Sequence, residues 1–91
     1  MSDMPSAVRF YKRTAEFDNE SVPNGLLKAH RTKSGTWGKI VVLKGVLEYR
    51  ILEPEYQAIE LSPNKYGVIE PTILHEVEPL TEVRFCVEFY R

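Results

Sequence analysis

The side chains best suited to chemistry are two histidines, His30 and His75, the only histidines in the chain. His75 follows a short predicted strand over residues 67–69 and a corner at Glu70-Pro71. Pro71 suits a corner because its φ is fixed at about −65° and its nitrogen carries no hydrogen. The corner turns the chain back, so we expect a second short strand to carry His75 toward His30.

Two imidazoles that meet inside a fold are candidate ligands for a divalent metal cofactor: Zn, Fe, Ni or Mn. A metal site needs at least a third protein ligand. Glu70 is the first candidate, since two histidines and one carboxylate form the facial triad of non-heme iron sites. Glu76 and Glu78 fit an exposed acidic rim better. The alternative is that both histidines are interior residues satisfied by hydrogen bonds, and their spacing alone favours that alternative.

Six other side chains are candidates for the wall of a ligand pocket. Two aromatic residues could form an apolar wall, and two arginines could orient an anionic ligand through paired hydrogen bonds. A threonine shares the predicted strand face of His30, and the single cysteine could be a soft ligand or a redox thiol. The set is Thr32, Trp37, Tyr49, Arg50, Arg84 and Cys86.

Each of these candidates also has a purely structural interpretation. Trp37 could fill the core of a small barrel. Arg50 and Arg84 could form cross-strand pairs with glutamates on a solvated face, each worth about 0.2 to 1 kcal/mol. Cys86 could be a small buried hydrophobe, which is the commoner situation for a free cysteine. For the arginines, the tryptophan and the cysteine, the structural interpretation is favoured.

Short strands separated by turn signals predict an all-β sandwich or small barrel. Asn-Gly and Ser-Gly pairs mark turns, because glycine and asparagine accept positive φ. A tight hairpin is predicted at Lys44-Gly45, and the run Ile40 to Leu43 predicts a strand covered on both sides. Strands are predicted over residues 7–13, 26–32, 36–43, 46–52, 56–61, 67–69 and 82–90, with one more short strand around His75.

Length and charge narrow the classes of function. The 91 residues make one domain over residues 1–91, in which residues 1–6 are expected to be loose. A net charge of −1 provides no basic field for nucleic acid or an anionic membrane. A single cysteine excludes an internal disulfide, and neither a signal peptide nor a long apolar run is present. We therefore expect a cytoplasmic protein.

Several stretches resemble the small cupin domain of the TehB/YeaR-like family, which is associated with tellurite resistance. They are HRTKSGTWGKIVVLKG from His30, YRILEP from Tyr49, IEPTILHEVEP from Ile69 and VRFCVEFYR from Val83. The resemblance runs from about residue 11 to residue 91 and implies a cupin-type β-barrel, or double-stranded jelly roll. It also implies that the domain occurs alone or ahead of a methyltransferase domain. The usual first cupin motif has a second histidine and a glutamate, but here Thr32 takes the histidine's place and no glutamate follows.

The predicted function is binding of a divalent metal or small ligand inside the barrel, through His30, His75 and Glu70. The resemblance links this function to stress from tellurite or other oxyanions. One alternative is a metal-dependent dioxygenase or isomerase, so the sequence leaves enzyme activity open. The other is a metal-free dimeric interaction module. The predicted partners are a metal ion or small molecule and a second copy of the chain, because a small barrel gains buried area by pairing.

Overall fold

Two of the longest strands, one in each sheet, alternate buried and more exposed side chains, so each presents one apolar face to the interior. In β4 (Trp37–Lys44), Ile40 and Val42 are buried while their neighbours are less so. In β5 (Leu47–Glu53), Leu47, Tyr49 and Ile51 are buried in the same way. Side chains alternate between the two faces of a strand, so this pattern places one face of each strand in a shared core.

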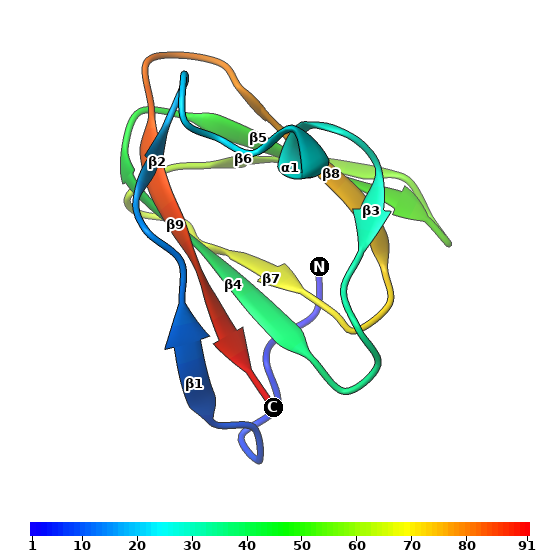
Figure 1. Ribbon diagram of the computed structural model, residues 1–91. Coiled ribbons are helices and arrows are strands. Elements are labelled where there is room, and N and C mark those ends of the chain that lie inside the picture. The colour runs from blue at the N-terminus through cyan, green and yellow to red at the C-terminus, as the bar shows by residue number, and fades with distance from the viewer.

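The computed structural model describes all 91 residues as two antiparallel sheets packed face to face (Figure 1). Sheet A has five strands in the order β1-β9-β4-β7, with β2 also paired to β9. Sheet B has four strands in the order β3-β8-β5-β6. The remaining bounds are β1 (Phe10–Arg13), β2 (Phe17–Asp18), β3 (His30–Arg31), β6 (Gln57–Leu61), β7 (Gly67–Ile69), β8 (Leu74–Pro79) and β9 (Arg84–Tyr90).

The predicted all-β class is confirmed. Every strand pairing is antiparallel, and the one helix, α1 (Asn24–Leu27), has four residues. A core of 12 buried apolar residues draws on both sheets, with Tyr49 and Phe85 as its largest members. Complete burial of one such large side chain contributes about 1.5 to 3 kcal/mol. No ladder joins the two sheets, so the barrel is not closed by hydrogen bonds.

The predicted hairpin at Lys44-Gly45 is wrong, because the chain crosses between sheets at that point. β4 pairs with β7 and β9, whereas β5 pairs with β6 and β8. Gly45 does adopt the left-handed conformation that the sequence predicts, with φ 78°. A Cβ at Gly45 would overlap the carbonyl oxygen of Glu82, so glycine also allows a close approach of two backbones.

Two other local predictions are wrong because tertiary packing decides them. The strand predicted over residues 26–32 shrinks to His30 and Arg31, and α1 takes the preceding residues. Leu26 and Leu27 pack from α1 against the core, which a helical turn after Pro23 permits. The run Ile40 to Leu43 is not covered on both faces along its whole length, since Leu43 is 45% exposed.

The start of the chain lies at the edges of both sheets. The amino group of Met1 donates to Oε1 of Gln57 at 2.9 Å, and the amide of Val68 approaches Sδ of Met1 at 3.1 Å. Most other side chains of residues 1–6 are exposed. No helix in the structure has the length and apolar character needed to cross a membrane.

Candidate functional site

The structure brings His30 and His75 together between the sheets. β3 pairs with β8 so that the two histidines lie directly opposite each other. Their ring centroids are 4.1 Å apart, with the ring planes tilted by 55°. His75 is fully buried and His30 is partly exposed, so the pair runs from the core toward the surface.

Each imidazole bonds to the backbone two residues earlier. Nδ1 of His75 lies 3.0 Å from the carbonyl oxygen of Ile73, and Nδ1 of His30 lies 3.4 Å from that of Lys28. A carbonyl oxygen can only accept, so the shorter contact assigns a ring proton to Nδ1 of His75. Nε2 of the neutral His75 ring is then left as an acceptor, and it is buried without a partner.

His75 is fully buried among mostly apolar side chains. Burial, reinforced by the nearby His30, lowers the pKa of His75 from 6.5 to about 4, against an opposing effect of the bond to Ile73. The ring of Tyr49 meets His75 edge-on, with centroids 5.9 Å apart. The Tyr49 hydroxyl donates to the carbonyl of Val68 at 2.9 Å, and burial raises the pKa of Tyr49 above its usual value. His75 is therefore neutral near pH 7.

The two residues after His30 hold the corner that delivers His75. Oγ1 of Thr32 donates to the carbonyl of Glu70 at 3.2 Å and accepts from the amide of Thr72 at 3.1 Å. The guanidinium of Arg31 donates to the carbonyl of Thr72 at 3.0 Å. Thr72 has φ 64°, a rare conformation for a β-branched residue. The corner is thus fixed by contacts from β3 and its continuation.

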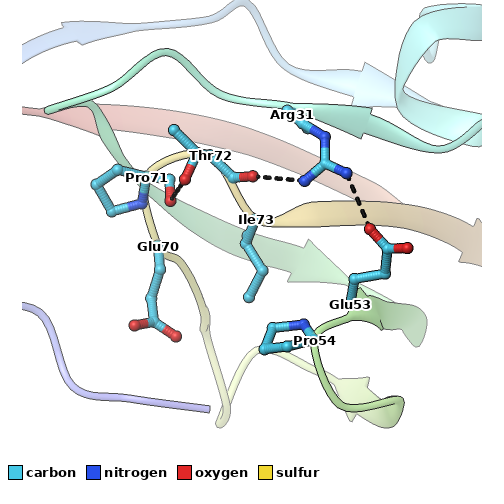
Figure 2. Close-up of a pocket in the computed structure, with 7 residues that line it drawn as sticks. All are labelled: Arg31, Glu53, Pro54, Glu70, Pro71, Thr72 and Ile73. Carbon is cyan, nitrogen blue, oxygen red and sulfur yellow. Dashed lines mark hydrogen bonds and ion pairs between the residues drawn. The ribbon is translucent and has the colours of Figure 1, made fainter.

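A polar groove opens beside this corner (Figure 2). It has a volume of about 580 Å³ and is lined by Arg31, Glu53, Pro54, Glu70, Pro71, Thr72 and Ile73. Arg31 forms an ion pair with Glu53 at 2.9 Å, and both side chains are more than half exposed. Figure 2 shows the Glu70 carboxylate pointing away from that pair. The sequence did not predict the groove, because no local pattern shows that Arg31 in β3 and Glu53 in β5 form an ion pair.

A second hollow, which we call the edge trough, consists of two adjoining cavities that share His30 and Phe89. The first, of about 340 Å³, lies between α1 and sheet A and has apolar walls that include Phe17, Leu26 and Val87. The second, of about 300 Å³, lies between β1 and β3 and is lined by Tyr11, Lys12, His30, Arg31, Thr32, Lys33, Thr36 and Phe89. The sequence does not indicate this trough, because residues 26–32 predict one continuous strand, whereas α1 and β3 form there.

Glu70 does not complete a metal centre with the histidines. The structure contains no group of three or more histidine, cysteine, aspartate or glutamate side chains that could hold a metal ion. The corner fixes the Glu70 backbone through Thr32, and Glu70 lines the polar groove. The predicted barrel metal site of His30, His75 and Glu70 is therefore unsupported.

The two predicted pocket arginines lie outside the space between the sheets. Arg50 contacts three carboxylates on the outer face of sheet B: Glu48 at 2.6 Å, Glu76 at 2.8 Å and Glu78 at 2.9 Å. These bonds raise the pKa of Arg50 further above its usual value. Arg84 is exposed and pairs with Glu16 at 3.4 Å.

The other predicted pocket residues also have separate surroundings. Trp37 pairs with Tyr90 on the outer face of sheet A, because Gly38 beside it faces inward against Ile69. Cys86 is 5% exposed, and burial raises the pKa of its thiol. Tyr49 lies in the core and Thr32 clasps the corner. The structure does not bring Thr32, Trp37, Tyr49, Arg50, Arg84 and Cys86 into one pocket.

Comparison with known proteins places this arrangement in a family. A family model described as the TehB-like domain matches residues 12–87. The chain belongs to the TehB-like domain family. Two proteins from strains of Haemophilus influenzae, both named "Probable S-adenosyl-L-methionine-dependent methyltransferase TehB", are 32% and 30% identical to it over 80 residues. The matches cover 84% of this TehB-like chain and 28% of each relative, so the chain spans under a third of their length.

Solved structures agree with this assignment. The crystal structure of TehB from Haemophilus influenzae matches with a TM-score of 0.86 and 29% identity, over 96% of this chain and 32% of that one. A protein from E. coli strain K12 matches with a TM-score of 0.88 over 100% of this chain and 97% of its own. Its sequence identity is 21%, so that likeness supports the fold alone.

These findings confirm the predicted family and correct the predicted function. The relatives carry the name of a methyltransferase, and no metal-ligand group is present, so the prediction of a metal- or ligand-binding cupin is wrong. The prediction of a metal-binding cupin is replaced by membership of the TehB-like domain family. The expectation of a divalent metal cofactor is not tested by the comparisons and stays a prediction.

Proposed function

We propose that this TehB-like domain is an accessory domain that binds an S-adenosyl-L-methionine-dependent methyltransferase without carrying out methyl transfer itself. The observation that carries the proposal is the match to TehB, which takes in 96% of this chain and only 32% of the TehB chain. Most of TehB therefore lies outside the matched domain. The methyltransferase activity in that protein's name is assigned here to the unmatched part.

The geometry of the domain is consistent with a binding role. Nucleotide-type cofactors commonly bind at the carboxyl ends of parallel strands next to helix N-termini. Here all strand pairs are antiparallel and the helix α1 has four residues. His75 is fully buried and neutral, and Arg31 is already paired with Glu53. The side chains of the candidate site thus hold the fold and shape its surface hollows.

Association with the unmatched part of TehB is the direct test. The TehB-like chain and the Haemophilus influenzae TehB segment outside the match are purified separately and mixed in a calorimeter, with and without S-adenosyl-L-methionine. We expect the two proteins to associate, and we expect the cofactor to bind the TehB segment but not the TehB-like chain alone. Absence of association in both conditions, or binding of the cofactor to this chain alone, would contradict the proposal.

The remaining expectations about partners and location stay predictions. Homodimerisation is tested by light scattering of the purified chain, where a mass twice the 10.5 kDa of one chain is expected. The absence of nucleic-acid and membrane partners is tested by binding to duplex DNA and to anionic vesicles, neither of which is expected. A cytoplasmic location is tested by cell fractionation.

A further inference from the structure

The edge trough lies where both sheets end. β1 and β2 pair only with β9, and β3 pairs only with β8. The far sides of these strands carry backbone groups that no strand of this domain pairs with. Exposed strand edges are sites where an extended segment can add by backbone hydrogen bonding. The position of the trough therefore favours an extended chain as its occupant.

The two cavities of the trough differ in chemistry. The cavity beside α1 is walled by apolar side chains, among them Phe17, Leu26 and Phe89. The adjoining cavity carries three cationic residues, Lys12, Arg31 and Lys33, and no acidic residue lines it. Lys12 and Lys33 are exposed and form no ion pair in the structure, whereas Arg31 is paired with Glu53. An occupant complementary to both parts is apolar at one end and acidic at the other.

We propose that the edge trough binds an extended segment of the methyltransferase in which a large apolar side chain is followed by carboxylates. The apolar side chain enters the cavity beside α1, and the carboxylates lie near Lys12 and Lys33. The identity of the partner rests on the proposed function, but the chemistry of the segment rests on the trough itself.

His30 provides a polar contact at the junction of the two cavities. Its Nδ1 is turned to the carbonyl of Lys28, so in the neutral ring Nε2 is the nitrogen that can accept a hydrogen bond. An amide N–H of a bound segment, or the N–H or O–H of a tryptophan or tyrosine, could supply that donor. Aromatic anchors in pockets are common centres of binding energy in protein interfaces.

Three short peptides test the chemistry of the trough without any partner protein. The acetylated amides Trp-Thr-Asp-Glu, Ala-Thr-Asp-Glu and Trp-Thr-Asn-Gln are titrated into ¹⁵N-labelled protein and followed by amide chemical shifts. We expect the first peptide to shift amides of α1, β3 and Phe89, and each control peptide to bind at least about fivefold more weakly. Equal binding of the three peptides, or shifts confined to the outer sheet faces, would overturn the proposal. Binding of decanoate in the trough without binding of the first peptide would also overturn the proposal.

Substitutions in the trough avoid the buried core. Lys12→Glu with Lys33→Glu reverses two exposed charges, and we expect about tenfold weaker binding of the first peptide. Gly25→Gln adds a long side chain to the wall of the apolar cavity, at a position where a Cβ meets nothing within 4 Å. We expect this variant to weaken binding as well. The matched control is Lys65→Glu, an exposed residue that lines neither cavity, for which no change is expected.

The same variants separate this inference from the proposed function. They are measured for association with the TehB segment outside the match. Weakening by the trough variants but not by Lys65→Glu supports both ideas. Normal association of all variants leaves the accessory role standing and overturns the trough as the docking site. If the wild-type domain fails to associate, the accessory role fails, and the peptide titration alone decides the chemistry of the trough.

Discussion

Burial makes it unfavourable for His75 to take up a proton in the folded protein. The residue is fully enclosed, and its Nε2 has no hydrogen-bond partner. A charged imidazole in that position would lose its hydration and lie beside a second imidazole, with the ring centroids 4.1 Å apart. Both effects favour the neutral form, so the histidine is tolerated in the core only without the extra proton.

Acid should therefore destabilise the domain through His75. The unfolded chain takes up a proton on this histidine below its ordinary pKa of 6.5, but the folded chain does so only near 4. The contribution to stability is complete above about pH 6.5 and is lost as the pH falls to about 4, by about 3 kcal/mol in total. Urea unfolding at about pH 7 and about pH 4.5 measures the loss.

Two substitutions identify the source of that loss. His75→Phe cannot take up a proton, so the difference in unfolding free energy between the two pH values should shrink. His30→Gln leaves the burial of His75, the larger cause of its lowered pKa, in place and should retain most of the difference. If both variants show the same pH dependence as the unmodified chain, burial of His75 is not responsible.

The sequence predicted residue positions better than side-chain directions. Pro71 marks the corner, and the pairing of two short strands brings the imidazoles together, as the sequence predicts. The direction of Glu70 depends on contacts from Thr32, 38 positions away along the chain. The positive φ of Thr72 runs against the preference of a β-branched residue, so no local pattern could have indicated it.

At the scale of elements, the crossovers between sheets depend on glycine and proline. Gly45 ends β4 and sends the chain into the other sheet, while Glu70-Pro71 does the same after β7. A sequence pattern marks both places as turns but does not show whether the next strand pairs with the previous one. The predicted hairpin failed for this reason, although the left-handed conformation of Gly45 was predicted.

Gly45→Ala should destabilise the domain by about 3 kcal/mol, because it combines a strained positive φ with a backbone overlap at Glu82. Gly25→Ala is the matched control. It adds a Cβ in open space within α1, so it should be neutral or raise stability by up to about 1 kcal/mol through helix propensity. Urea unfolding at constant pH measures both. Equal effects of the two substitutions would show that the crossover at Gly45 tolerates a side chain.

Across the whole molecule, the strands in the middle of each sheet are the most stable elements, and the elements around the edge trough are the most accessible. The central strands β4, β9, β5 and β8 each pair with neighbours on both sides and supply much of the core. The elements around the edge trough are short and have few backbone bonds: β2 and β3 have two residues each, and α1 has four. Elements with few protected hydrogen bonds open most readily.

Amide hydrogen exchange should reveal this gradient. We expect the amides of β4, β9, β5 and β8 to exchange at rates set by global unfolding, and those of β1, β2, β3 and α1 to exchange much faster by local opening. All four border elements have one unpaired side or a single turn of helix, and most of the 12-residue core lies in the other strands. The peptide Trp-Thr-Asp-Glu should slow amide exchange in the border elements and leave the exchange rates of the central strands unchanged. Uniform protection of all strands would instead mean that the trough is as rigid as the core, and an added strand would then have no loosely held edge to join.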